Sequence, residues 1–287
     1  MFSGSISNIE IKKMGLDLKA RTYVMGVLNV TPDSFSDGGL FFDEDIAVNR
    51  CLELEKQGAD IIDLGGESTR PAAGPVSIDE ELKRVLPVII RARSLLNIPI
   101  SIDTYKSKVA QEALKAGASI VNDISALRFD PEMADVVAKH NAFVILMHIK
   151  GTPLTMQDDP KYGDVVKDII AYLEESIAIA KSSGVSDDKI IIDPGIGFGK
   201  TPEHNLEILN RLDELKVLKK PIAIGTSRKS FIGKVLDLDV NDRLVGSLTS
   251  ATVAICKGAN IVRVHDVAES KQAAKMADSI IRRKQER

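Results

Sequence analysis

The sequence predicts an α/β protein of the (β/α)8 TIM-barrel class, and three features favour this fold. The chain has 287 residues with 44% apolar content, which suits a single large domain spanning residues 1–287. Short runs rich in β-branched residues, each followed by a helical pattern, begin at Thr22, Asp60, Pro99, Ser119, Ala142, Lys189, Pro221 and Asn260. These runs are apolar on both faces, as in parallel strands covered by helices. Eight such units can close into a barrel, and an open doubly wound sheet is the alternative.

The segments that flank the predicted strands agree with this fold. Alternating apolar residues within 6–18 predict a short N-terminal β-hairpin at the bottom of the barrel. The covering helices should be amphipathic, and one apolar stripe is formed by Val166, Ile169, Ile170, Leu173 and Ile177. Helix starts are predicted by a capping box at Ser77 and Glu80 and by capping residues before proline at Asp130-Pro131 and Thr201-Pro202. A glycine-led turn from helix to strand recurs at 58–61, 117–120 and 258–261.

Composition excludes several classes of function. The net charge of -3 is spread along the chain, and aromatic residues make up only 4%, so we expect no nucleic-acid partner. The sequence has no apolar signal core and no run of about 20 apolar residues, so we expect a cytoplasmic protein that does not enter a membrane. Cys51 and Cys256 lack metal-ligand spacing and are expected to be small core residues without a disulfide.

Polar side chains follow the predicted strands at their carboxyl ends, where barrel enzymes carry their active sites. In chain order they are Asn29, Asp63, Asp103, Asn122 with Asp123, His148, Asp193, Thr226 to Lys229, and Arg263 with His265. Any one of them could be a helix cap or a buried group bonded to nearby backbone. Together, carboxylates, amides and cations at one rim predict a site for a polar heterocycle or a phosphate ester. The glycine-rich stretch 193–200 lacks the Walker spacing, so we interpret it as a tight turn.

Several segments carry a resemblance to a known family. The stretches MGVLNVTPDSFSDGG, DLGGESTRP, SIDTYKSKVA, MHIKGTPLTMQ, DPGIGFGKT, GTSRKSFIG and RVHDV lie in order between Met25 and Val267. In this combination the chain resembles the dihydropteroate synthases. Ala72 departs from the glycine that is more usual in the family, and Ile149 from the common methionine. Because Ala72 follows the Ser-Thr-Arg-Pro motif, its departure affects the expected conformation of the loop that contains this motif.

The resemblance implies a reaction and a set of site residues. Family members join 4-aminobenzoate to the methylene carbon of 6-hydroxymethyl-7,8-dihydropterin diphosphate and release diphosphate with the help of Mg2+. It implies that Asp103, Lys229, Arg263 and His265 are catalytic. It also implies that the pterin is bound by Asp103, Asn122, Asp193, Lys229 and Arg263, with Asp193 accepting two hydrogen bonds from the amino-pyrimidinone edge.

The same resemblance assigns the other ligands. Diphosphate would be bound by Asn29, Thr69, Arg263 and His265, and Asn29 would supply the single protein contact to Mg2+. The aminobenzoate would contact Thr69, Pro71, Phe198, Lys229 and Ser230, with Ser230 opening a helix whose free N–H groups can hold its carboxylate. Departure of diphosphate before attack would leave a cationic methylene that Asp103 can stabilise. Family members are usually dimers, so a homodimer is expected.

Three other functions remain open from the sequence. A methyltetrahydrofolate-binding methyltransferase shares the barrel and the pterin pocket, and a non-catalytic pterin-binding protein would retain the pocket alone. A Schiff-base aldolase would use Lys229, but such a lysine needs a desolvated pocket, and Lys229 adjoins Arg228 in a predicted loop. The segments at Thr31–Leu40 and Glu67–Val76 are longer than plain connections, so we expect them to be mobile and to cover the site when ligands bind.

Overall fold

The described part of the chain forms a closed barrel of parallel strands. The computed structural model describes residues 21–30, 44–68 and 74–281. Its strands are β1 (Tyr23–Asn29), β2 (Ile61–Gly65), β3 (Ile100–Asp103), β4 (Ile120–Asp123), β5 (Phe143–Met147), β6 (Ile190–Asp193), β7 (Ala223–Ile224) and β8 (Ile261–Val264). They pair in the order β6-β5-β4-β3-β2-β1-β8-β7, and a parallel bridge between Ile192 and Ile222 joins the two ends of the sheet. The predicted (β/α)8 barrel is confirmed, and the open-sheet alternative is wrong.

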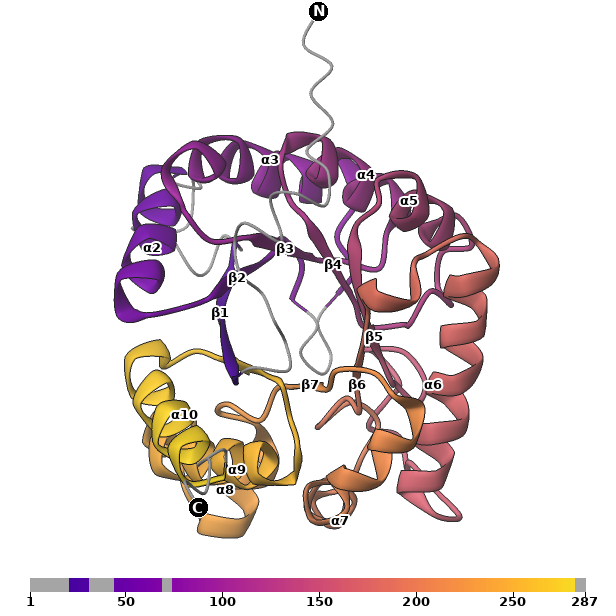
Figure 1. Cartoon of the computed structure of the whole chain (residues 1–287), viewed down its shortest axis with the longest axis vertical. Coiled ribbons are helices and arrows are strands. Elements are labelled where there is room, and N and C mark those ends of the chain that lie inside the picture. The colour runs from indigo at the N-terminus through magenta and orange to yellow at the C-terminus, as the bar shows by residue number, and fades with distance from the viewer. Residues whose placement is uncertain (1–20, 31–43, 69–73, 282–287) are drawn as a thin grey trace, which may run out of the picture.

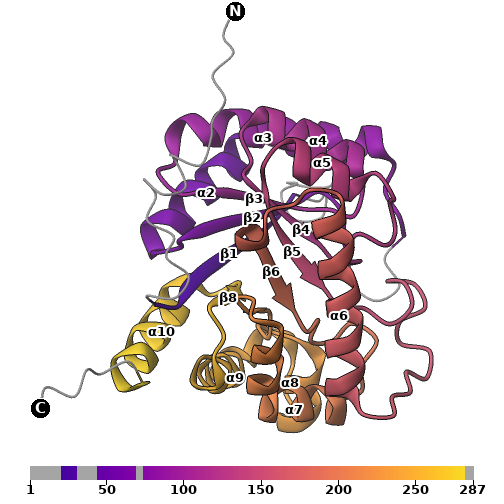
Figure 2. The same cartoon turned by 45° about the vertical axis from the view of Figure 1, so that its right-hand side comes forward.

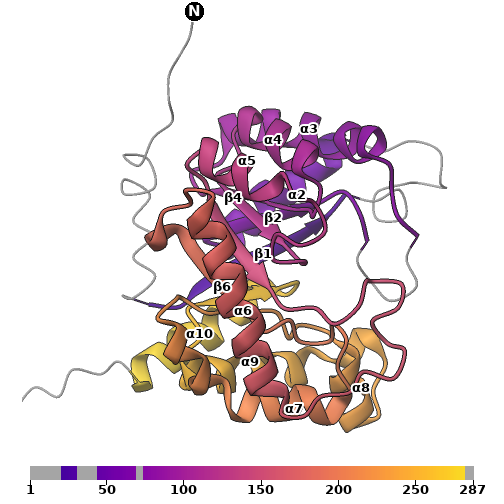
Figure 3. The same ribbon diagram turned by 90° about the vertical axis from the view of Figure 1, so that its right-hand side faces the viewer.

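Helices surround the barrel and shield its outer face from solvent (Figure 1). Within the described residues they are α2 (Glu44–Gln57), α3 (Ile78–Leu95), α4 (Ser107–Ala116), α5 (Met133–Lys139), α6 (Val165–Ser182), α7 (Pro202–Asn210), α8 (Ser230–Leu236), α9 (Leu244–Lys257) and α10 (Val267–Ile281). Short 3-10 turns are η2 (Asp187–Lys189), η3 (Leu212–Leu218) and η4 (Val240–Asp242). Figure 2 shows the strands inside the helices, and Figure 3 shows α6 along the outside of the sheet. The predicted stripe on α6 is confirmed, since Val166, Ile169 and Leu173 are buried.

The local signals that define the helix ends are mostly confirmed. Ser77 caps α3 by accepting a hydrogen bond from the Glu80 N–H at 3.2 Å, although the Glu80 carboxylate turns to Arg84 instead of completing a capping box. Thr201 caps α7, and Pro202 is its first helical residue. The start predicted at Pro131 is wrong, because α5 begins at Met133.

Each of the three glycine turns adopts the backbone that its sequence predicted. Gly58, Gly117 and Gly258 have φ of +104°, +122° and +112°, a region that costs glycine little and other residues more. Each turn reverses the chain from a covering helix into a strand. The same local conformation therefore sets where β2, β4 and β8 begin.

Some other expectations have mixed outcomes. Cys51 is buried and free as expected, but Cys256 is exposed on α9, so its placement in the core is wrong. None of the described helices is both long and apolar enough to cross a bilayer. The predicted N-terminal hairpin and the whole of the predicted mobile loop at 31–40 lie outside the described residues, as does 69–73 of the second loop. That the whole of 1–287 is one domain stays a prediction.

Candidate active site

The barrel interior changes from apolar to polar along the strands. A layer of side chains near the strand starts fills the bottom and consists of Tyr23, Met25, Ile61, Ile120, Ile145, Ile191, Ala223 and Ile261. Because side chains alternate between the two faces of a strand, the next inward position lies two residues further on. At that level β2, β3, β4, β6 and β8 carry Asp63, Asp103, Asn122, Asp193 and Arg263. The alternation therefore stacks a polar layer directly above the apolar one.

Arg263 is the centre of this polar layer. Its Nε donates to Asp63 Oδ2 at 2.6 Å, and its Nη2 donates to Asp103 Oδ2 at 2.7 Å. Asn122 Nδ2 donates to the same Asp63 oxygen at 3.1 Å. Four side chains from β2, β3, β4 and β8 thus form one connected network.

The network carries two carboxylates and one guanidinium, and the pKa values of Asp103 and Arg263 are shifted in it. Burial raises the pKa of Asp103 to about 7, with Arg263 opposing the shift and Asp63 adding to it. Burial alone would lower the pKa of Arg263, but the charges of Asp63 and Asp103 raise it above its ordinary value. The arginine is therefore fixed as a cation. Oδ1 of Asp63 and Oδ1 of Asp103 are buried and have no hydrogen-bond donor within the described part of the chain.

Asp193 at the end of β6 and Lys229 after β7 lie close enough to this network for their charges to act on it. Asp193 is 6% exposed, and its Oδ1 accepts a hydrogen bond from the Gly195 N–H at 2.7 Å. Lys229 donates to the carbonyl of Ile196, and its ammonium lies 4.3 Å from the centre of the Phe198 ring. Burial lowers the pKa of Lys229 to about 8. Lys229 is therefore less solvated than its place beside Arg228 in a predicted loop suggested.

The glycine-rich loop after β6 is a packed turn, as predicted. Gly195 and Gly199 have φ of +69° and +66°, and a β-carbon on Gly195 would lie 1.9 Å from the carbonyl oxygen of His148. The Gly197 N–H donates to Asn205 Oδ1 at 2.7 Å. The loop amide of Gly197 is thus satisfied by protein, and the close packing of the loop against β5 explains the need for glycine.

Two other polar residues at the strand ends also have structural partners. Lys200 Nζ lies 2.9 Å from His148 Nδ1 and donates to the Phe198 carbonyl at 2.8 Å. Asp123 accepts hydrogen bonds from the Ser125 and Leu127 N–H groups, both at 2.8 Å. His148 and Asp123 are 4% and 0% exposed, so for both of them the simple structural interpretation holds.

The end of β8 carries His265, the other residue of this strand segment that is expected to bind diphosphate. His265 Nδ1 lies 3.1 Å from Ser227 Oγ, which places the end of β8 beside the turn after β7. In that turn Arg228 has φ of +57° and donates from Nε to Asp266 Oδ2 at 3.0 Å. Because Arg228 turns outward to Asp266, the next residue, Lys229, turns inward to the site. Arg263 and His265 thus lie at the same end of the barrel, two positions apart on one chain segment.

Asn29 ends β1 at the same rim, paired in register with Gly65 of β2. Among the described residues no group of three or more His, Cys, Asp or Glu side chains could hold a metal ion. The amide oxygen of Asn29 is a hard donor that suits Mg2+, but one such donor requires water or ligand oxygens to complete the coordination. Thr69 and Pro71 lie outside the described residues.

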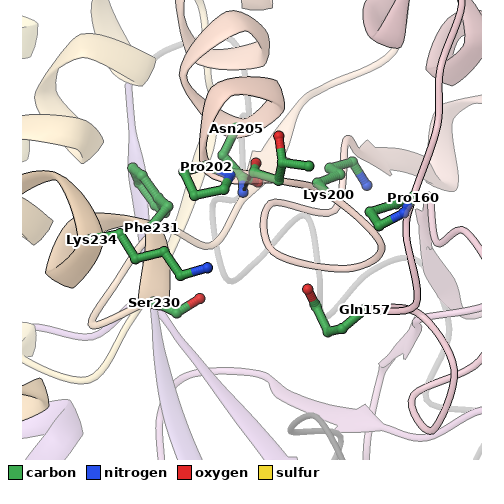
Figure 4. Close-up of a pocket in the computed structure, with 9 residues that line it drawn as sticks. Gln157, Pro160, Lys200, Pro202, Asn205, Ser230, Phe231 and Lys234 are labelled. Carbon is green, nitrogen blue, oxygen red and sulfur yellow. Dashed lines mark hydrogen bonds between the residues drawn. The ribbon is translucent and has the colours of Figure 1, made fainter.

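A cavity of about 150 Å3 lies beside Ser230, the first residue of α8. Its walls come from the segment after β5, the start of α7 and α8. Figure 4 shows Ser230, Lys234 and Gln157 directed toward its centre. The cavity therefore gives the region around Ser230 a polar lining with a lysine and room for a small anionic ligand.

Asp63 is the residue whose role the sequence did not assign. It ends a predicted strand, and its side chain is 0% exposed while bonding both Arg263 and Asn122. The sequence does indicate where Asp63 lies: it comes two residues after Ile61, whose side chain points into the barrel, so Asp63 belongs to the polar layer. Nothing in the sequence indicates that it, rather than solvent or ligand, holds the arginine.

Comparisons with known proteins agree with this site. Residues 25–265 match the pterin binding enzyme family. A dihydropteroate synthase of Clostridium beijerinckii is 50% identical over 276 residues, covering 96% of this chain and 100% of that protein. A crystal structure of Clostridium difficile dihydropteroate synthase with pteroic acid matches with a TM-score of 0.89 and 52% identity, covering 93% and 100% of the two chains. Xanthomonas albilineans dihydropteroate synthase with 4-aminobenzoic acid matches with a TM-score of 0.86 and 42% identity, covering 91% and 93%.

These similarities decide between the functions that the sequence left open. The relatives are named as synthases, and they match this chain along nearly its full length and theirs. The methyltransferase, the non-catalytic binding protein and the aldolase are therefore not favoured. The chain belongs to the pterin-binding enzyme family and, within it, to the dihydropteroate synthases.

Proposed function

We propose that the polar rim of the barrel binds 6-hydroxymethyl-7,8-dihydropterin diphosphate and 4-aminobenzoate and joins them into 7,8-dihydropteroate. The observation that carries this proposal is the network in which buried Asp63 and Asp103 hold Arg263, with Asn122 beside it. A flat heterocycle rich in donors and acceptors fits such an array. The pteroic acid and 4-aminobenzoic acid present in structures of two relatives support the choice of substrates.

Asp193 is proposed to bind the amino-pyrimidinone edge of the pterin. Its carboxylate is buried at the end of β6 and keeps only one described backbone partner, the Gly195 N–H. Burial raises its pKa, so the ionised form is costly until donors arrive. Two parallel N–H donors from the ring would satisfy the carboxylate and offset that cost. Asp103, Asn122 and Lys229 complete the proposed ring contacts.

Arg263 and His265 are proposed to hold the diphosphate while the reaction takes place. The aminobenzoate nitrogen forms a bond to the pterin methylene carbon, and the carbon–oxygen bond to diphosphate breaks with its electron pair leaving on oxygen. The nitrogen then loses a proton to solvent. Fixed cations stabilise the charge that develops on the leaving group. If the bond to oxygen breaks first, the ionised Asp103 stabilises the cationic methylene.

The aminobenzoate is proposed to lie between Phe198, Lys229 and Ser230. The Phe198 ring and the Lys229 side chain already contact each other, with the ammonium 4.3 Å from the ring centre, and so form one wall. Ser230 and the cavity beside it offer a polar end for the carboxylate. Thr69 and Pro71 are proposed to complete the contacts.

Mg2+ is proposed to enter with the diphosphate rather than to occupy a protein cage. Asn29 at the end of β1 would hold it, with diphosphate oxygens and waters as the other ligands. When bound, the metal would neutralise part of the charge on the leaving group.

A cytoplasmic homodimer is proposed for the assembly. The α8–α9 region exposes five aliphatic side chains within eleven residues: Val235, Leu236, Leu238, Val240 and Val245, at 53%, 47%, 37%, 47% and 72%. Clustered exposed apolar groups are typical of protein contacts. Light scattering tests this: a dimer that Val245→Glu dissociates would support it, and a wild-type monomer would contradict it.

Turnover is the direct test of the proposed function. Purified protein is mixed with Mg2+, the dihydropterin diphosphate and labelled 4-aminobenzoate, and labelled dihydropteroate is separated by chromatography. Formation of product and diphosphate in equal amounts is expected. Binding of both substrates without product would refute the proposal.

A further inference from the structure

The loop after β6 is held on both sides of Phe198 by side chains of another segment. The Gly197 carbonyl accepts a hydrogen bond from Gln157 Nε2 at 2.8 Å. The Gly199 carbonyl accepts one from the Tyr162 hydroxyl at 2.6 Å. Both donors lie between β5 and α6, and neither is assigned to a substrate above. Two peptide groups that flank Phe198 are thus fixed from outside the loop.

These hydrogen bonds matter because glycine gives the backbone around Phe198 little conformational preference of its own. Gly197 and Gly199 have φ of +83° and +66°. A β-carbon on Gly199 would lie 2.5 Å from the Lys150 carbonyl oxygen, so glycine lets the two segments approach closely. Lys200 supplies a further bond, donating to the Phe198 carbonyl at 2.8 Å. The direction of the Phe198 ring therefore depends on the donors that meet these carbonyls.

Tyr162 is itself firmly placed. Its ring packs edge-on against His204 of α7, with 5.0 Å between the ring centres, and the Lys150 ammonium lies 4.3 Å from the ring centre. The same ammonium donates to the Lys161 carbonyl, which joins two points of the segment eleven residues apart. Burial raises the pKa of the Tyr162 phenol, so its hydroxyl stays protonated and available as a donor. A donor fixed in this way can set the position of the loop that accepts from it.

Phe198 belongs to the aminobenzoate side of the site, whereas the pterin side has other supports. The Phe198 ring lies 4.3 Å from the Lys229 ammonium and forms with it the wall proposed for aminobenzoate. The pterin contact Asp103 is fixed by Arg263 at 2.7 Å, outside the loop. Loss of the hydrogen bond at Gly199 should therefore disturb the aminobenzoate wall and leave this pterin contact in place.

We propose that Tyr162 is a positioning residue for the second substrate, one that holds the loop beside Phe198 and so sets the affinity for 4-aminobenzoate without contacting it. Gln157 holds the other side of Phe198 in the same way. This inference rests on the proposed function. Because Gln157 also lines the cavity beside Ser230, Tyr162 gives the cleaner test.

The test compares Tyr162→Phe with Tyr172→Phe. Each change removes one hydroxyl that donates to a backbone carbonyl, which for Tyr172 is that of Ser125 at 2.8 Å, and both rings are half-buried beside His148. Tyr162→Phe is expected to raise the KM for aminobenzoate about fivefold, the equivalent of one hydrogen bond of about 1 kcal/mol. The value of kcat and the calorimetric Kd for dihydropterin diphosphate should stay within about twofold, a difference of about 0.4 kcal/mol. Tyr172→Phe should match the wild type in all three values.

A double-mutant cycle with Phe198 separates positioning from a general loosening of the fold. In a Phe198→Ala background there is no ring left to position, so Tyr162→Phe should change the KM by less than about twofold. The full effect in that background would overturn the proposal, as would an unchanged KM in Tyr162→Phe or an equal loss of pterin affinity. A KM that rises in both tyrosine variants in proportion to their loss of urea stability would also overturn it. Failure of the wild type to form product refutes the proposed function instead.

Discussion

Asp103→Asn should stabilise the folded protein at alkaline pH while removing activity. Asp103 shares the guanidinium of Arg263 with Asp63, and burial raises its pKa from 3.8 to about 7. Between these two values the folded protein holds a proton that the unfolded chain has released. The free energy of unfolding therefore falls as pH rises from about 4 to about 7 and stays low above that range. Asparagine does not titrate, so the variant lacks this loss.

The magnitude follows from the change in pKa. A rise of about 3 pH units, at about 1.4 kcal/mol each, corresponds to about 4 kcal/mol of stability lost between pH 4 and pH 8. The substitution also removes the ion pair between Asp103 and Arg263, but Arg263 keeps Asp63 at 2.6 Å. Between pH 5 and pH 8 about two of these units are covered, so the difference in unfolding free energy, variant minus wild type, should be more positive at pH 8 than at pH 5 by about 3 kcal/mol.

Urea denaturation followed by far-ultraviolet circular dichroism at pH 5 and pH 8 measures this difference. Asp158→Asn, which changes an exposed carboxylate in the loop after β5, is the matched control and should show no such dependence. An equal stability difference for Asp103→Asn at the two pH values would refute the reasoning. So would a variant with full turnover.

Three further predictions concern the ligands. Asp193→Asn should weaken pterin binding by about 2 to 5 kcal/mol in a folded protein, and near-normal binding by calorimetry would contradict its role. Arg263→Ala should weaken diphosphate binding far more than Lys200→Ala, because the Lys200 ammonium already contacts His148 and the Phe198 carbonyl. If titrations show that Lys200→Ala weakens diphosphate binding more, the diphosphate site has been assigned to the wrong residues. Asn29→Ala should raise the Mg2+ concentration needed for half-maximal rate several-fold, and an unchanged requirement would exclude it as a metal contact.

The sequence predicts the strands, helices and turns of this protein well because these elements depend on local patterns of residues. Short apolar runs rich in β-branched residues and glycine turns are encoded within a few residues, and the strands begin within two residues of their predicted starts. Inward and outward positions follow from alternation along each strand. Asp103, Asn122, Asp193 and Arg263 were accordingly predicted at one rim, and they lie there.

Contacts across the barrel are harder to predict because they depend on closure and on side-chain direction. Asp63 and Arg263 are 200 residues apart in the chain, and their bond exists only because β2 and β8 both pair with β1 and so lie one strand apart in the barrel. Lys229 looked solvated because a charged neighbour precedes it. The positive φ of Arg228 sends the two side chains in opposite directions, which a pattern of residue types does not reveal.

The unpaired acceptors of the network suggest how the site favours its ligand. Asp63 and Asp103 share one guanidinium, and Oδ1 of each has no donor within the described residues. Buried acceptors without donors cost free energy, so donors supplied by a ligand would stabilise these two oxygens. A ligand edge that presents N–H donors would remove this cost, while a ligand that presents only acceptors would add to it. The burial that makes ionised Asp103 destabilising at alkaline pH therefore also makes the site selective for a heterocycle rich in N–H donors.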